Sequence, residues 1–69
     1  MHTMESLLKK YGKVEARFYG GKVQGVINGY SLEIDTFEYG FTVYLFLNGG
    51  IRKFFETIGQ LESFLNSLA

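Results

Sequence analysis

One short segment, residues 41–47 (Phe-Thr-Val-Tyr-Leu-Phe-Leu), constrains the fold most strongly. β-Branched and aromatic residues fill it, and a glycine precedes it while an Asn-Gly-Gly sequence follows it. It is long enough for a strand and too short for a membrane-spanning helix. Apolar residues occupy both alternating sets of positions, with Val43 and Leu45 on one side and Tyr44 and Phe46 on the other. Such a strand is typical of the middle of a sheet that is covered on both faces, so function depends on what covers the second face.

The chain length predicts one small domain, residues 1–69, that is held together by apolar burial alone. The sequence has no cysteine for disulfides, and its single histidine is too few for the usual zinc ligand sets. Seven phenylalanines and five tyrosines can supply much of the buried area that so small a core needs. We therefore expect neither a metal nor a cofactor.

The net charge of zero argues against a general binder of polyanions. Bases concentrate in residues 1–31 and acids in residues 32–69, and in so small a domain we expect the two halves to pair internally. The first ten residues contain no apolar leader, and a chain without cysteine is compatible with any compartment. We expect a cytoplasmic protein that has no membrane partner and no small-molecule substrate.

The spacing of apolar residues predicts seven secondary-structure elements. Helical spacing predicts a short N-terminal helix over residues 4–11 and a C-terminal helix over residues 58–68, the second one introduced by a Thr57/Gln60 capping box. Between the helices the period changes to two, and glycine-containing turns separate five segments. The predicted strands cover residues 13–19, 22–27, 30–36, 41–47 and 51–56. The fold class is therefore α+β, a five-stranded antiparallel meander sheet with both helices packed on one face.

The turn between the first two strands contains two glycines and fixes how those strands pair. A two-residue turn at this point would place Phe18 opposite Val23 and Ala16 opposite Gly25 on one face of the sheet. Arg17 would then lie on the other face. Two small residues side by side would let a helix approach the sheet closely.

The three later connections fix the remaining registers in the same way. The first two place Ile34 between Val23 and Val43, and the last places Leu47 opposite Ile51. The predicted connections have two, four and three residues, at residues 28–29, 37–40 and 48–50.

With these registers one face of the sheet is almost wholly apolar and suits the two helices. Lys53, on the last strand, is the charged exception on this face. An inward-pointing lysine on an edge strand discourages the edge from pairing with another chain.

The second face of the sheet is where we expect function. The predicted register places Phe54 beside Tyr44 and Arg52 beside Phe46, with Val26 two strands away. Aromatic side chains with an arginine at their margin are the composition of a hot spot in a protein interface. An exposed apolar patch of this size is also uncommon on a monomer. The predicted partner-binding residues are Tyr44, Phe46, Phe54, Arg52 and Val26, and Phe37 and Tyr39 in the loop would form a secondary contact.

These features predict a non-enzymatic protein-binding module that forms a homodimer, or that docks on a larger protein and modulates it as an adaptor. One alternative is a small inhibitor of a host protein, of the type that phages and mobile elements encode. Another is a single-stranded nucleic-acid binder that stacks bases on the same aromatic residues. Nucleic acid is the less favoured partner because Glu33, Asp35 and Glu56 would lie on the same face and repel phosphates.

Two arrangements of the chain would remove this site. The N-terminal helix could cross to the second face and cover Tyr44 and Phe46, or the strands could curl into a small barrel.

Catalysis has little support from the sequence. Glu33 and Asp35 lie two apart on one strand, at a spacing that paired catalytic carboxylates can use, but a flat sheet offers no cleft that would shift their pKa values. We therefore expect no enzyme.

Overall fold

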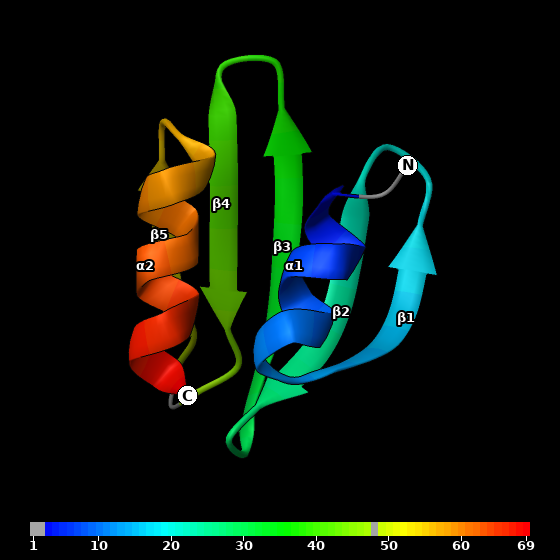
Figure 1. Ribbon diagram of the computed structural model, residues 1–69, viewed down its shortest axis with the longest axis vertical. Helices are drawn as coiled ribbons and strands as arrows, with labels where there is room; N and C mark the ends of the chain where they lie inside the picture. The colour runs from blue at the N-terminus through cyan, green and yellow to red at the C-terminus, as the bar shows by residue number, and fades with distance from the viewer. Residues whose placement is uncertain (1–2, 48) are drawn as a thin grey trace.

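The computed structural model describes residues 3–47 and 49–69. Met1 and His2 lie outside the described residues, and so does Asn48, which belongs to the predicted loop at residues 48–50. The strands form one open antiparallel sheet in the order β1-β2-β3-β4-β5, and both helices lie on the same face of it (Figure 1). The predicted α+β meander is therefore confirmed, and the barrel is excluded. The elements are α1 (Thr3–Tyr11), β1 (Lys13–Phe18), β2 (Lys22–Ile27), β3 (Tyr30–Phe37), β4 (Gly40–Leu45), β5 (Ile51–Phe55) and α2 (Ile58–Leu68).

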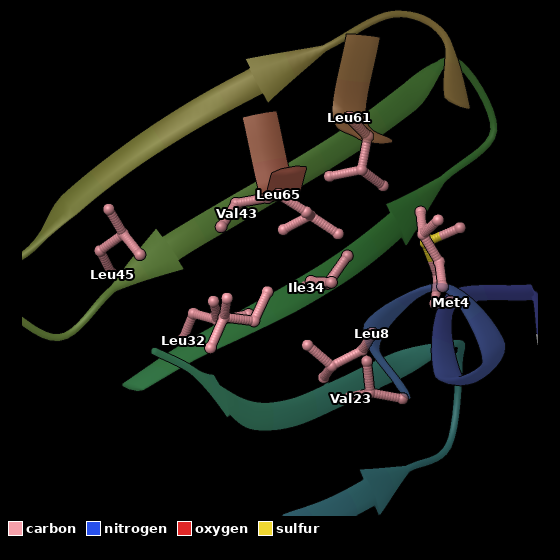
Figure 2. Close-up of a cluster of buried hydrophobic side chains, with 11 residues drawn as sticks. Met4, Leu8, Val23, Leu32, Ile34, Val43, Leu45, Leu61 and Leu65 are labelled. Carbon is pink, nitrogen blue, oxygen red and sulfur yellow. The ribbon is translucent and has the colours of Figure 1, made fainter. Parts of the chain in front are cut away.

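The hydrophobic core fills the space between the sheet and the two helices (Figure 2). Leu8 of α1 and Leu61 and Leu65 of α2 are fully buried there, together with Ile34 of β3 and Val43 of β4. Burying a side chain of this size contributes about 1.5–3 kcal/mol. The apolar side of α1 is thus used on the core face, and α1 does not cross to the other face.

Helix α2 begins as the sequence predicts. The hydroxyl of Thr57 accepts a hydrogen bond from the backbone N–H of Gln60 at 3.2 Å, and the Gln60 side chain accepts one from the backbone N–H of Thr57 at 3.4 Å. This reciprocal capping box satisfies N–H groups that the first turn of a helix leaves without a partner. Within the described ranges, no helix is long and apolar enough to span a membrane.

The two central registers agree with the prediction, since Ile34 pairs with Val23 on one side and with Val43 on the other. The β1–β2 register does not. Phe18 pairs with Lys22 and Arg17 with Val23, so the turn has three residues instead of two. This shift by one residue exchanges the faces, because side chains alternate along a strand. Arg17 consequently lies on the helix side, and Phe18 is 48% exposed instead of buried in the core.

A β-bulge between Val14 and Ala16 corrects the alternation further along β1. Val14 pairs with Gly25 and packs against the core, whereas Ala16 pairs with Gln24 on the other face. The predicted neighbour of Gly25 is therefore wrong. Gly25 itself does allow the close approach of a helix, since a Cβ atom added there would lie 2.7 Å from Cδ2 of Leu8.

The β4–β5 register differs from the prediction by two residues. Leu45, not Leu47, pairs with Ile51, so the connection is longer than the predicted three residues. Inside it, the backbone N–H of Gly50 donates to the carbonyl oxygen of Leu47 at 2.7 Å. A shift by two residues leaves every side chain on its predicted face but changes its neighbours across the strands.

Candidate functional site

The face of the sheet opposite the helices, which we call the open face, carries aromatic side chains along its β3–β5 half. They form two groups. The loop cluster is Tyr44 and Phe46, which lie near the β4–β5 connection and are joined by Arg52. The turn cluster, at the β3–β4 turn, consists of Phe37, Tyr39 and Phe54. Together the two clusters make up what we call the aromatic stripe.

The loop cluster is built around the half-buried ring of Tyr44. The Phe46 ring stands edge-on to it, with centroids 4.8 Å apart and an interplanar angle of 83°. The guanidinium carbon of Arg52, directly opposite on β5, lies 5.1 Å from the centroid of the Tyr44 ring, which is a cation–π geometry. Phe46 lies just beyond β4, and its backbone N–H donates to the carbonyl oxygen of Ser31 at 3.0 Å. This hydrogen bond keeps Phe46 beside the sheet.

The ring of Tyr44 in the loop cluster packs directly against the backbone of Gly50. A Cβ atom added to Gly50 would collide with the phenol ring and hydroxyl of Tyr44. Gly50 also has a φ of +80°, a backbone conformation that favours glycine. The ring of Tyr44 is thus held in place by the sheet on one side and by the β4–β5 connection on the other.

The turn cluster follows the β3–β4 hairpin. The rings of Phe37 and Tyr39 are stacked with centroids 5.9 Å apart, and those of Tyr39 and Phe54 are tilted at 6.1 Å. Tyr39 is 74% exposed and Phe54 48%. Because Phe54 pairs with Thr42 instead of Tyr44, the predicted contact between Phe54 and Tyr44 is wrong. Phe54 joins Phe37 and Tyr39, which the sequence suggested as a secondary contact in a four-residue loop. Phe37 is instead the last residue of β3 and pairs with Gly40, so the turn contains only Glu38 and Tyr39.

The open face carries an ion pair between Glu33 and Lys22. Glu33, opposite Tyr44, accepts a hydrogen bond from Gln24 at 3.0 Å and forms an ion pair with Lys22 at 3.1 Å. The hydrogen bond from Gln24, with Lys22 and Arg52 nearby, lowers the pKa of the Glu33 carboxyl. Lys22 reaches this diagonal carboxylate and not that of Asp35, its direct neighbour on β3.

The structure brings most of the predicted site residues together, in two clusters instead of one. Tyr44, Phe46 and Arg52 are in contact, although Arg52 lies opposite Tyr44 and not opposite Phe46. Val26 is two strands away, as expected, and lies opposite Ser31 on β3. The sequence did not predict the two glycines against which the rings pack, Gly50 beneath Tyr44 and Gly40 beneath Phe54. A glycine that lies diagonally opposite an aromatic residue on the neighbouring strand is the signal that could have revealed them.

The arrangement is an exposed aromatic surface, with few features of a catalytic site. The carboxylate of Glu33 is already engaged by Gln24 and Lys22. Among the described residues there is no group of three or more histidine, aspartate or glutamate side chains that could hold a metal ion. Comparison with protein-family models, curated proteins and solved structures finds no match for the chain.

Proposed function

We propose that this protein is a non-enzymatic protein-binding module that docks on protein surfaces through the aromatic stripe, and first of all on a second copy of itself. The observation that carries the proposal is the exposure of the stripe. Phe37, Tyr39, Phe46 and Phe54 remain between 40% and 74% exposed on a face that carries neither helix (Figure 1). Exposed apolar patches rimmed by polar residues mark interaction surfaces.

The rings are also held in place before any partner arrives. Tyr44 lies against Gly50, and Phe54 lies against Gly40. An aromatic side chain has two rotatable bonds, and fixing them in advance lowers the entropic cost of binding. Aromatic anchors flanked by an arginine are the residues that most often carry the binding energy of an interface.

A second copy suits this face because its charge is balanced. In a two-fold interface the same patch meets itself, so a face with net charge would repel its partner. Strands β2 to β5 of the open face carry two bases, Lys22 and Arg52, and two acids, Glu33 and Asp35. A standard interface buries about 800 Å² on each partner. That is slightly under a fifth of the 4485 Å² surface of the chain, which one face of a small domain can supply.

Single-stranded nucleic acid has less support as a partner. Its bases could stack on the rings, but its phosphates would meet Glu33 and Asp35. Of the two bases on this face, Lys22 is already paired with Glu33, and Arg52 lies over Tyr44. A larger protein that is modulated or inhibited by this chain would contact the same stripe that a second copy contacts.

We propose a cytoplasmic location, since a chain without cysteine needs no oxidising compartment.

Sedimentation equilibrium over a concentration series up to ~100 µM tests self-association. We expect the wild type to dimerise and Phe46→Lys to stay monomeric, because the substitution places a charge in the loop cluster. Tyr19→Lys is the matched control, since Tyr19 is fully exposed in the β1–β2 turn, away from the stripe. A wild-type monomer that is indistinguishable from Phe46→Lys across the series would remove the second copy as the partner.

Titration of a fluorescent single-stranded oligonucleotide at two salt concentrations separates the other class of partner. We expect no saturable binding. Binding that weakens steeply with salt and is lost in Phe46→Lys and in Phe46→Ala would assign the stripe to nucleic acid instead of protein.

A further inference from the structure

A pocket of about 350 Å³ lies on the helix side of the sheet, on the face opposite the aromatic stripe. It is located between the first turns of α1 and α2, which begin at the same end of the sheet (Figure 1). Met4 of α1 and Ile58 of α2 form two of its walls, and Val23 and Phe41 line it from β2 and β4. Small-molecule sites are typically about 300–1,000 Å³ and mostly apolar, and this pocket fits that description.

The pocket exists because the core is filled only further along the helices. Leu8, Leu61 and Leu65 close the space over the middle of the sheet (Figure 2). At the pocket end the lining includes Gly21 and Thr36, which are too small to fill the gap. The hydroxyl of Thr36 donates to the carbonyl oxygen of Gly21 at 3.1 Å, so this polar group already has a partner. The interior is therefore suited to an apolar group.

Three charged residues line the pocket, the bases Arg17 and Lys22 and the acid Glu5, and the Arg17 side chain is 63% exposed at its mouth. Glu5, whose side chain is only 13% exposed, lies 3.5 Å from Lys9 and 3.3 Å from Arg17, so one carboxylate is shared by two cations. Burial opposes the ionisation of Glu5, but Arg17 and Lys9 outweigh burial and lower its pKa. Both contacts of Arg17 with Glu5 use the Nη1 atom. Within the described ranges, the Nη2 and Nε groups of Arg17 donate to no protein acceptor.

We propose that this pocket binds an aliphatic carboxylate of medium chain length, with its chain against Met4, Val23, Phe41 and Ile58 and its carboxylate paired with Arg17 at the mouth. An arginine fork matches the geometry of a carboxylate, and charge-assisted hydrogen bonds of this kind are the stronger ones. A cationic head group would instead meet Arg17 and Lys22, the two bases that line the pocket. The bound chain would cover Ile58, an apolar side chain that is 40% exposed at the margin of the pocket. This proposal does not depend on the aromatic stripe.

Nuclear magnetic resonance titration of the full chain with octanoate, kept below its micelle concentration, tests the proposal. We expect saturable shifts at Ile58 and Phe41, and weaker binding of 1-octanol, which has the same chain without the charge. Arg17→Gln should bind octanoate about tenfold more weakly, the size expected for a charge-assisted hydrogen bond at a partly exposed site. Arg52→Gln, which removes the same charge from the open face, should bind it as the wild type does.

Ile58→Glu gives a second variant that is expected to fold. Ile58 is exposed at the start of α2, a helix with no acidic residue in its first turn, and glutamate suits that position. Its charge should repel octanoate and abolish the shifts. The proposal is overturned if octanoate produces no saturable shifts, or if the shifts lie outside the pocket. It is also overturned if 1-octanol binds as tightly as octanoate, or if Arg17→Gln and Ile58→Glu both bind octanoate normally.

Discussion

The ring of Phe54 covers the α-carbon of Gly40, its diagonal neighbour across the β4–β5 pair. A Cβ atom added at Gly40 would lie 2.5 Å from Cζ of Phe54 and 2.6 Å from the carbonyl oxygen of Phe55. Glycine weakens a strand because it has no side chain to pack, and an aromatic ring from the neighbouring strand compensates for that loss. The same contact fixes the orientation of a ring in the proposed binding surface, so stability and function are linked at this position.

The first prediction concerns this contact. Gly40→Ala should destabilise the fold by about 1–3 kcal/mol in urea unfolding, because the added methyl group has no room. Gly59→Ala is the control. Gly59 lies in the first turn of α2, and a Cβ atom added there would have Oγ1 of Thr57 as its nearest neighbour, at an ordinary contact distance of 4.0 Å, so alanine there should be neutral or stabilise by up to about 1 kcal/mol.

A double-mutant cycle identifies which neighbour causes the penalty. In a Phe54→Ala background the cost of Gly40→Ala should shrink, since the ring is gone, but it should not vanish, because the Phe55 carbonyl remains. An equal cost in both backgrounds would show that the ring of Phe54 does not press on Gly40.

The β2–β3 register, which the sequence predicted correctly, is set by unambiguous local chemistry. Asn28 and Gly29 both have positive φ, at 49° and 84°, which is what a two-residue hairpin turn of this type requires. The glycines at 20 and 21 also have positive φ, but the turn includes Tyr19 as well. Two glycines tolerate more than one turn length, so their presence did not decide the register of β1.

The faces of the candidate site were more predictable than its contacts. Alternation placed Tyr44, Phe46 and Phe54 on the open face even though the β4–β5 register was wrong by two residues, since such a shift conserves the face. The neighbours of Phe54 could not be derived, because they depend on the loop length. The pocket beside Arg17 could not be predicted, because the β1–β2 register was wrong by one residue. A shift by one residue exchanges the faces, and Arg17 therefore lies on the helix side instead of the open face.

The second prediction tests the β1 register in solution. Gly25→Ala should destabilise the fold by about 1–3 kcal/mol, because the methyl group would meet Leu8 of α1 and the carbonyl oxygen of Lys13. Ala16→Lys should change stability by less than about 0.5 kcal/mol, because Ala16 lies opposite Gln24 on the open face. Urea unfolding measures both. A large loss from Ala16→Lys would favour the pairing of Ala16 with Gly25 that the structure excludes.

The third prediction concerns pH. Glu62 of α2 accepts hydrogen bonds from Lys10 at 2.6 Å and from Tyr11 at 2.7 Å, and so links the two helices. These hydrogen bonds lower the pKa of the Glu62 carboxyl below its ordinary value of 4.5. A group whose pKa is lower in the folded state stabilises the fold fully above its unfolded pKa, and this contribution is lost as the pH falls through the folded pKa.

Glu62→Gln should therefore lower the melting temperature at neutral pH. It should also make the decline in melting temperature shallower between pH 4.5 and about pH 3. Glu38→Gln removes the same formal charge from the exposed β3–β4 turn and serves as the control. Parallel acid profiles for Glu62→Gln and the wild type would contradict the role assigned to this contact.

The last prediction concerns the sheet edge. Strand β5 lies at one end of the sheet, and Lys53 points to the helix side, with its Nζ atom 6.0 Å from the centroid of the Phe64 ring. An inward-pointing charge on an edge strand blocks pairing with another edge. Lys53→Val should leave the fold intact, since valine suits a strand, but it should promote slow association through β5. Static light scattering over days measures this association. Comparing Lys53→Val with Lys53→Arg in the Phe46→Lys background removes any dimer formed through the open face. Equal scattering from the two variants would mean that the charge of Lys53 does not protect the edge.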